Sequence, residues 1–308
     1  MSAETSKVVV AGAGLMGLGI AHAFASTGHR TIMVDVSQAA LDRAHAAVAR
    51  ILAEGVTRGK MTQAQSEASL ARLTGSVDLG AAAQGAGLLV ETATESMSVK
   101  IAILEAAEAG LPDTALIATN TSALSVTELA SATRDPSRVV GMHFFNPVQK
   151  MKLVELVRGL KTSEDALSRA RAYAVALGKT SIVVNEAPGL TTSRMSALLG
   201  NEAMWMLQEG AATAEDIDTA LRLGLNHPMG PLELGDVTGW DTRLSVLQYL
   251  HATLGEKFRP CPLIAKMVKA GRTGRKSGAG VYEYLNGEKV PGSGLRPNPS
   301  GPPPEQHR

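Results

Sequence analysis

The chain has 308 residues, enough for two domains of about 150 residues each. It contains 30 lysines and arginines and 29 aspartates and glutamates, so its formal net charge is +1. That balance argues against a nucleic-acid-binding protein, which needs excess positive charge to meet phosphates. With 44% hydrophobic and 19% charged residues, the composition also excludes a wholly disordered chain.

The single cysteine, Cys261, excludes an intramolecular disulfide and a thiolate zinc site. We therefore expect no metal centre, and a reduced cytoplasmic setting fits this count. Residues 8–25 superficially resemble a secretory signal, but four glycines and His22 within them argue against one. Elsewhere no uninterrupted apolar run reaches membrane-spanning length, so no association with a membrane is expected.

Short β-branched runs alternate with helical patterns in the first half of the chain. This alternation is typical of βαβ units and predicts an α/β Rossmann-type doubly wound sheet. Helices are expected at Met16–Ser26, Ala39–Ala53 and about Thr62–Leu73. Strands are expected at Lys7–Ala11, Thr31–Asp35, Leu88–Thr92, Ala115–Thr119, Val139–Phe144, Lys152–Val157 and Ser181–Val184.

The pattern changes near Pro188, after which helical periodicity dominates and predicts an all-α C-terminal domain. The expected domains are an α/β domain at residues 1–187 and a helical domain at residues 188–286. Residues 287–308 are rich in Pro, Gly and Ser and predict a disordered tail. The helices of the second domain are expected at Ser193–Glu209, Ala214–Leu223, Leu232–Leu254 and Leu263–Ala270.

A glycine-rich loop follows the first predicted strand, with the pattern G-x-G-x-x-G at Gly12, Gly14 and Gly17. The first glycine permits a tight turn, the second lets backbone approach a pyrophosphate, and the third lets helix and strand pack closely. Leu15 and the helix expected from Met16 then offer free N–H groups to phosphates.

Asp35 ends the second predicted strand, eighteen residues after Gly17. A carboxylate there accepts hydrogen bonds from an adenosine ribose and repels a 2′-phosphate. No Arg or Lys occurs in residues 36–38 to bind such a phosphate. The sequence therefore predicts NAD rather than NADP as the cofactor.

His143 ends a predicted strand in the same half of the chain, where ligands of open α/β sheets gather. Glu155 lies twelve residues later in an apolar run, and a carboxylate in such a strand needs a partner. A His–Glu pair would meet both requirements, because the carboxylate orients the imidazole and makes it a better general base. The alternative is a hydrogen-bonded core histidine and a solvent-facing glutamate.

The order of several motifs resembles the short-chain L-3-hydroxyacyl-CoA dehydrogenases, and most of all their bacterial 3-hydroxybutyryl-CoA branch. The resemblance runs from about Lys7 to Tyr284. It implies reversible oxidation of a 3-hydroxyacyl-CoA to the 3-ketoacyl-CoA with NAD. The motifs are Gly12–Gly17, Asn120–Ser122, His143–Pro147, Met151–Val157, Leu223–Pro231 and Gly274–Gly278.

The resemblance also implies roles for individual residues. His143 would take the hydroxyl proton while Glu155 orients and charge-balances it, with Ser122 beside the substrate hydroxyl. Arg58 and Lys60 would bind the CoA phosphate. Residues 1–187 would form the NAD-binding domain, and the helical domain of residues 188–286 would bind substrate and form a homodimer. Besides the glycine loop and Asp35, the implied cofactor contacts are Glu95, Lys100, Asn120, Ser122, Asn146 and Lys276.

One departure from the family pattern concerns substrate binding. The family has Asn where this chain has Ser193, and serine is shorter and lacks the two amide donors. A lost substrate hydrogen bond would cost about 1–3 kcal/mol. Three hypotheses therefore compete: a CoA-thioester dehydrogenase, a related dehydrogenase of a free hydroxy acid or carnitine-like alcohol, and a non-catalytic NAD-binding protein of the crystallin kind.

Overall fold

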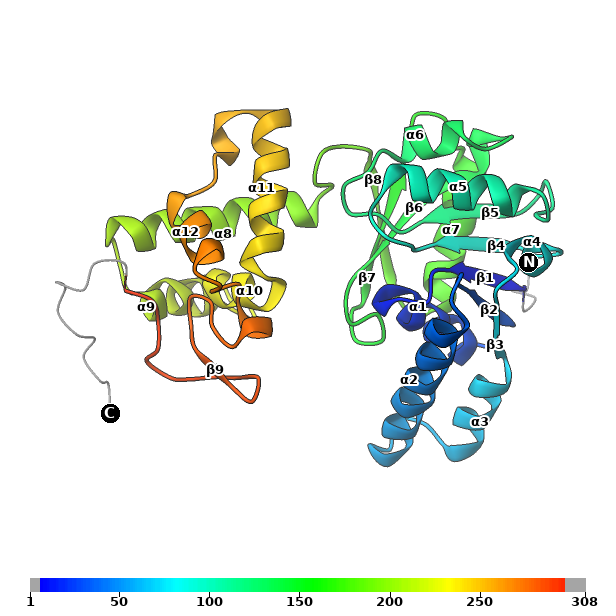
Figure 1. The fold of residues 1–308 in the computed structure, drawn as a ribbon, viewed down its shortest axis with the longest axis horizontal. Coiled ribbons are helices and arrows are strands. Elements are labelled where there is room, and N and C mark those ends of the chain that lie inside the picture. The colour runs from blue at the N-terminus through cyan, green and yellow to red at the C-terminus, as the bar shows by residue number, and fades with distance from the viewer. Residues whose placement is uncertain (1–5, 297–308) are drawn as a thin grey trace. The chain divides into compact units, whose positions relative to one another are not determined.

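The computed structural model describes residues 6–296, which divide between Ala187 and Pro188 into two compact units (Figure 1). The first unit is built on one eight-stranded sheet with the order β3-β2-β1-β4-β5-β6-β7-β8. Its strands are β1 (Val8–Ala11), β2 (Thr31–Val34), β3 (Leu73–Ser76), β4 (Leu88–Glu91), β5 (Leu116–Thr119), β6 (Val139–Phe144), β7 (Leu153–Arg158) and β8 (Thr180–Asn185).

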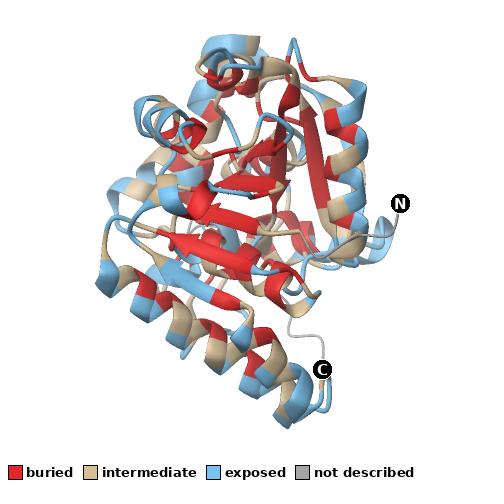
Figure 2. Cartoon of the chain, turned by 90° about the vertical axis from the view of Figure 1, so that its right-hand side faces the viewer, coloured by how far each residue is buried: buried red, intermediate tan, exposed pale blue. Residues whose placement is uncertain are grey.

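Helices cover both faces of this sheet, which confirms the doubly wound fold (Figure 1). All residues of the central strands β1, β4 and β5 are buried, and the aliphatic core continues into the inner faces of the helices (Figure 2). The helices are α1 (Leu15–Ser26), α2 (Gln38–Thr57), α3 (Gln63–Ala71), α4 (Leu79–Ala83), α5 (Met97–Glu108), α6 (Val126–Ser131), the 3₁₀ turn η1 (Pro136–Arg138) and α7 (Glu164–Ala176).

Two features of the sheet differ from the sequence-based expectation. Strand β3 was not foreseen, because Leu-Thr-Gly-Ser has little β propensity and only Leu73 is buried on this edge strand. Strand β7 runs antiparallel to β6, while β8 runs parallel to β7. Only eight residues separate β6 from β7, whereas a parallel crossover needs a dozen or more.

The second unit is mainly helical, and the predicted helix Leu232–Leu254 is in fact two helices separated by Gly239 at φ +97°. The buried Asp236 accepts hydrogen bonds from Trp240 Nε1 at 2.6 Å and from the Val281 N–H at 2.7 Å. The elements of the second unit are α8 (Thr192–Glu209), α9 (Ala214–Thr219), the π-helical turn η2 (Ala220–Gly224), α10 (Pro231–Thr238), α11 (Trp240–Leu254), η3 (Glu256–Phe258), α12 (Pro262–Lys269), η4 (Arg275–Ser277), β9 (Tyr284–Leu285) and β10 (Glu288–Lys289).

The disordered tail expected from Gly287 needs correction over residues 287–296. There β10 pairs with β9, and the Leu295 N–H donates to the Val281 carbonyl at 2.8 Å. The Gly294 N–H donates to Glu215 Oε1, also at 2.8 Å. Backbone hydrogen bonds thus hold a segment that lacks apolar periodicity. The remaining part of the expected tail, residues 297–308, lies outside the described residues.

Candidate active site

The glycine loop joins β1 to α1, and its three spaced glycines meet different steric demands. A Cβ on Gly17 would lie 1.8 Å from the Gly12 carbonyl oxygen, so only glycine lets the helix pack this closely. Gly12 itself has φ +111°, and a Cβ there would lie 2.8 Å from the Thr92 oxygen. At Gly14, the N-cap of α1, a Cβ would meet nothing within 4 Å. The absent side chain therefore leaves open space at the start of the helix.

Asp35 follows β2 and binds the glycine loop. Its Oδ2 accepts a hydrogen bond from the Ala13 N–H at 3.0 Å, and its Oδ1 accepts one from the Ser37 N–H at 3.1 Å. Each carboxylate oxygen retains a further lone pair, which ribose hydroxyls can use. Asp35 thus has a structural bond that the sequence pattern did not reveal, together with the capacity expected for ribose binding.

These residues fit the pyrophosphate and ribose of a dinucleotide. No side chain caps the N-terminus of α1, and the helix dipole favours an anion at that end. Leu15 in the first turn is 66% exposed, and Met16 is partly exposed. A phosphate can therefore reach the first turn of the helix, and Asp35 is hydrogen-bonded to the same loop through the Ala13 N–H.

His143 and Glu155 are register partners across the antiparallel strands β6 and β7. His143 Nδ1 lies 2.7 Å from Glu155 Oε2; Glu155 is fully buried and His143 is 8% exposed. Because an ionised carboxylate can only accept, we assign the proton to Nδ1, which leaves Nε2 as an acceptor. The ring of Phe145 lies beside the imidazole, with 4.6 Å between centroids. The structure thus brings the predicted pair together.

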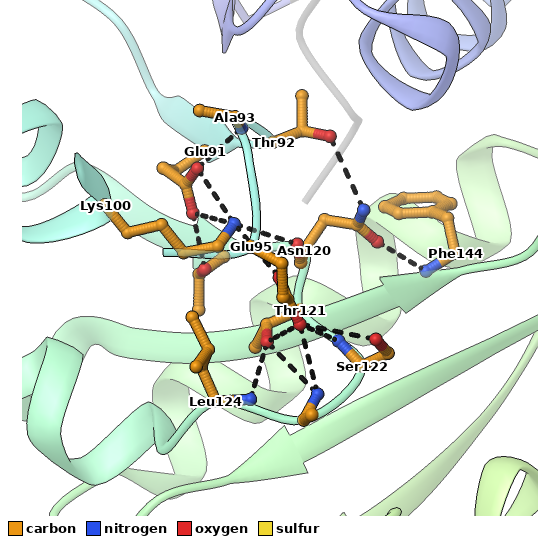
Figure 3. Close-up of polar contacts among 12 residues, drawn as sticks. Glu91, Thr92, Ala93, Glu95, Lys100, Asn120, Thr121, Ser122, Leu124 and Phe144 are labelled. Carbon is orange, nitrogen blue, oxygen red and sulfur yellow. Dashed lines mark hydrogen bonds and ion pairs between the residues drawn. The ribbon is translucent and has the colours of Figure 1, made fainter. Parts of the chain in front are cut away.

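A buried ion pair lies where β4 and β5 end (Figure 3). Lys100 Nζ, on α5, donates to Glu91 Oε1 at 3.0 Å and to Oε2 at 2.8 Å, and both side chains are fully buried. Glu91 also accepts from the Thr119 hydroxyl at 2.7 Å and from the Ala93 N–H at 2.7 Å. Lys100 is therefore enclosed by protein groups, whereas the family resemblance implied a cofactor contact.

Glu95 binds the loop that follows β5 (Figure 3). Its Oε1 accepts from the Thr121 hydroxyl at 2.6 Å and from the Ser122 N–H at 2.9 Å. The Glu95 side chain is 39% exposed, and its Oε2 lies 3.7 Å from Lys100 Nζ. Glu95 consequently links the buried ion pair to an exposed loop that carries Ser122.

The side chain of Asn120 connects the ends of three neighbouring strands. Its Oδ1 accepts from the Phe144 N–H at 2.9 Å, and its Nδ2 lies 3.4 Å from Thr92 Oγ1. Its backbone carbonyl accepts from Lys100 Nζ at 3.2 Å. Phe144 directly follows His143, so the loop that holds Ser122 and the strand that holds His143 are hydrogen-bonded to each other (Figure 3).

The remaining candidate residues belong to other elements of the two units. Within the first unit, Asn146 is exposed after β6, and Arg58 at the end of α2 lies 3.6 Å from Glu54 Oε2 with Lys60 exposed nearby. Ser193 and Lys276 belong to the second unit. There Lys276 Nζ donates to Asp241 Oδ2 at 2.6 Å, and this bond holds the pKa of Asp241 below its usual range.

Sequence reasoning missed Glu91 and Phe145. Glu91 ends the apolar run Leu88–Glu91, and a carboxylate in a fully buried strand requires a cation, which could have directed attention to Lys100 nine residues later. Phe145 gave no comparable signal, because an aromatic residue two positions after a histidine is most often part of a core.

A glycine loop of this geometry on a mostly parallel sheet defines a dinucleotide-binding α/β protein. The family model described as 3-hydroxyacyl-CoA dehydrogenase, NAD binding domain, matches residues 7–187, and the model for the C-terminal domain of that enzyme matches residues 189–284. The chain belongs to the 3-hydroxyacyl-CoA dehydrogenase family. It is accordingly an NAD-dependent oxidoreductase, and this assignment favours the CoA-thioester hypothesis over its two competitors.

Individual relatives agree with the family model. A probable 3-hydroxybutyryl-CoA dehydrogenase of Bacillus subtilis (strain 168) is 42% identical over 91% of this chain and 98% of the relative. A 3-hydroxyadipyl-CoA dehydrogenase of Escherichia coli (strain K12) is 38% identical over 92% of this chain and 60% of the relative. The crystal structure of (S)-3-hydroxybutyryl-CoA dehydrogenase from Ralstonia eutropha has a TM-score of 0.88 at 41% identity, covering 92% of this chain and all of the other.

Residues 6–296 contain neither a candidate membrane span nor a candidate metal centre. None of the helices described there combines the length and the apolar character needed to cross a membrane. In the same residues no group of three or more His, Cys, Asp or Glu side chains could hold a metal ion.

Proposed function

We propose that the protein oxidises a short-chain (3S)-3-hydroxyacyl-CoA, with 3-hydroxybutyryl-CoA as the first candidate, reversibly to the 3-ketoacyl-CoA. The observation that carries this proposal is the His143–Glu155 pair, with 2.7 Å between Nδ1 and Oε2. The names of the Bacillus subtilis and Ralstonia eutropha relatives support the four-carbon substrate. The proposed division of labour is cofactor binding by residues 1–187 and substrate binding by residues 188–286.

His143 acts as the general base in this proposal. Glu155 accepts a hydrogen bond from Nδ1–H, so Nε2 can present its lone pair to the substrate hydroxyl. His143 takes the hydroxyl proton as C3 loses a hydride, and in the reverse direction it returns that proton to the ketone oxygen. NAD, when bound, supplies the hydride acceptor. Because Glu155 is fully buried, water does not compete with His143 for its carboxylate.

Further polar residues would position substrate and cofactor. Ser122 is exposed on the loop after β5, and we assign its hydroxyl to the substrate hydroxyl and the cofactor. Asn146 and Lys276 are assigned to the cofactor and Ser193 to the substrate, as the family resemblance implies. The glycine loop, Asp35, Glu95 and Asn120 complete the proposed cofactor site.

Arg58 and Lys60 are the proposed contacts to the CoA phosphate. Both are exposed at the end of α2, and the only ion pair of Arg58 among the described residues is the exposed one with Glu54, which is worth little in water. We further propose a homodimer formed through the helical unit, where the apolar side chains of Met195 and Leu223 are 64% and 75% exposed. A cytoplasmic location is also proposed.

The test measures NADH formation with four substrates: 3-hydroxybutyryl-CoA, a longer 3-hydroxyacyl-CoA, free 3-hydroxybutyrate and carnitine. Turnover confined to the CoA thioesters and fastest with the four-carbon one supports the proposal, while turnover of free acids alone contradicts it. Arg58→Ser should raise KM for the thioester severalfold without changing NADH affinity. Arg50→Ser, an exposed arginine on the same helix, is the matched control.

A further inference from the structure

Lys100 is the most deeply enclosed cation of the first unit among the described residues. Its side chain is fully buried, and its three N–H directions are occupied by Glu91 Oε1, Glu91 Oε2 and the Asn120 carbonyl at 3.0, 2.8 and 3.2 Å. An ammonium has three donors, so none remains for a bound molecule. The role of Lys100 must therefore be exerted through the groups that it holds.

We propose that Lys100, charge-balanced by Glu91, is a positioning residue that fixes Glu95 and the loop of residues 120–124 beside His143. This inference rests on the proposed function. Figure 3 shows the connection. Lys100 donates to the Asn120 carbonyl, and the Asn120 side chain accepts from the Phe144 N–H. Lys100 Nζ also lies 3.7 Å from Oε2 of Glu95, whose carboxylate accepts hydrogen bonds from the loop.

The charges explain why an ammonium is needed at this point. Glu91 ends β4, and Glu95 lies in the loop between β4 and α5. The Lys100 ammonium lies within 4 Å of both carboxylates. Coulomb attraction draws the partly exposed Glu95 inward, where Thr121 and the Ser122 N–H reach its Oε1. Without the ammonium, Glu95 would gain hydration by turning outward, and the loop would lose its acceptor.

A merely structural role makes a different prediction. Replacing a buried ion pair by neutral groups of similar size is often neutral for stability. If Lys100 only fills space and balances Glu91, a neutral pair at both positions should leave the loop and the reaction unchanged. If it positions the loop, the neutral pair should preserve the fold but release residues 122–124.

The experiment compares the full-length protein with the double variant Glu91→Gln/Lys100→Met. The glutamine can still accept from Thr119 or the Ala93 N–H. Lys100→Met alone would leave Glu91 buried without a cation and serves only to measure the cost of the unpaired charge. The matched control is Glu108→Gln/Arg138→Met, which neutralises the buried Glu108–Arg138 pair of the same unit and also removes the carboxylate partner of Arg134, a half-exposed arginine.

The first readout is amide hydrogen exchange without any ligand. We expect the amides of residues 122–124 to exchange at least tenfold faster in the Glu91→Gln/Lys100→Met protein, with β6 unchanged, and the control to match the wild type. Unchanged exchange in the loop would overturn the proposal. This readout needs no substrate, so it stands even if 3-hydroxybutyryl-CoA fails as the substrate.

The second readout is a cycle with Glu95→Ala. In the wild-type background this change should lower kcat at least tenfold, and in the Glu91→Gln/Lys100→Met background its effect should shrink at least threefold, because the loop is already released. Additive effects would contradict a shared role. A rise in the NADH dissociation constant of more than tenfold with kcat unchanged in the double variant would instead show a direct cofactor contact by Lys100 and overturn the inference.

Discussion

His143 and Glu155 are direct cross-strand partners, because β7 turns back antiparallel beside β6 and places the two residues opposite each other. The 2.7 Å contact between Nδ1 and Oε2 orients the imidazole, and with the carboxylate as acceptor we assign the proton to Nδ1. The reversal of strand direction between β6 and β7 thus places the proposed general base beside its carboxylate partner, and the parallel strands before it carry the glycine loop.

Replacing the Glu155 carboxylate by an amide should disable the base without unfolding the sheet. In Glu155→Gln the amide nitrogen can donate to Nδ1, which favours the tautomer with its proton on Nε2 and leaves no lone pair for the substrate. We expect kcat to fall by about 10²–10⁴-fold. Steady-state kinetics and NADH fluorescence titration measure this, with Glu164→Gln on the surface as control. Retention of more than half of kcat would count against the assigned tautomer.

Two glycines of the same loop should respond differently to an added methyl group. Gly17→Ala would press a Cβ against the Gly12 carbonyl, so we expect a loss of more than about 3 kcal/mol in the free energy of unfolding. Gly14→Ala meets no protein atom and should change that free energy by less than about 1 kcal/mol. Its methyl would occupy the space at the start of α1, and NADH affinity should fall at least tenfold. Normal NADH affinity in Gly14→Ala would exclude phosphate binding there.

Ser193 tests whether the departure from the family pattern limits the reaction. If serine is a weaker replacement for asparagine, Ser193→Asn should preserve kcat/KM for 3-hydroxybutyryl-CoA or raise it by up to about tenfold. A tenfold rise corresponds to about 1.4 kcal/mol of transition-state stabilisation. The measurement compares four-carbon and longer thioesters in both proteins. A sharp loss with the four-carbon substrate would indicate that the enzyme is built around serine for a different acyl group.

His29 should make the first unit less stable at mildly acidic pH. Burial against Phe24 and Tyr173 lowers the pKa of His29, although its bond to the Ser6 carbonyl opposes the shift. The unfolded chain therefore binds a proton near pH 6.5 that the folded chain resists, so this contribution is complete above pH 6.5 and is lost as pH falls toward the lowered value. Chemical unfolding between pH 7.5 and 5.5 should show a smaller loss for His29→Phe than for the wild type. Parallel losses would be inconsistent with this origin.

Much of the fold could be predicted from the sequence, because β-branched runs and glycine loops act locally. The start of α1 followed from spacing and residue type. For His143 and Glu155 these left an unpaired alternative open, and the family resemblance favoured the pair. The ion pair of Glu91 with Lys100 could not be derived so directly, because it joins a strand end to a helix through tertiary packing. The break at Gly239 was missed because apolar periodicity continues across it.

The most direct test of the account is the rate of NADH formation by His143→Asn with saturating NAD and 3-hydroxybutyryl-CoA. The variant keeps a polar side chain in the strand but has no nitrogen that can act as a base near neutral pH. Turnover should fall by about two to four orders of magnitude, while NADH affinity should change less than threefold. Turnover within threefold of the wild type would remove His143 from the mechanism and contradict the account.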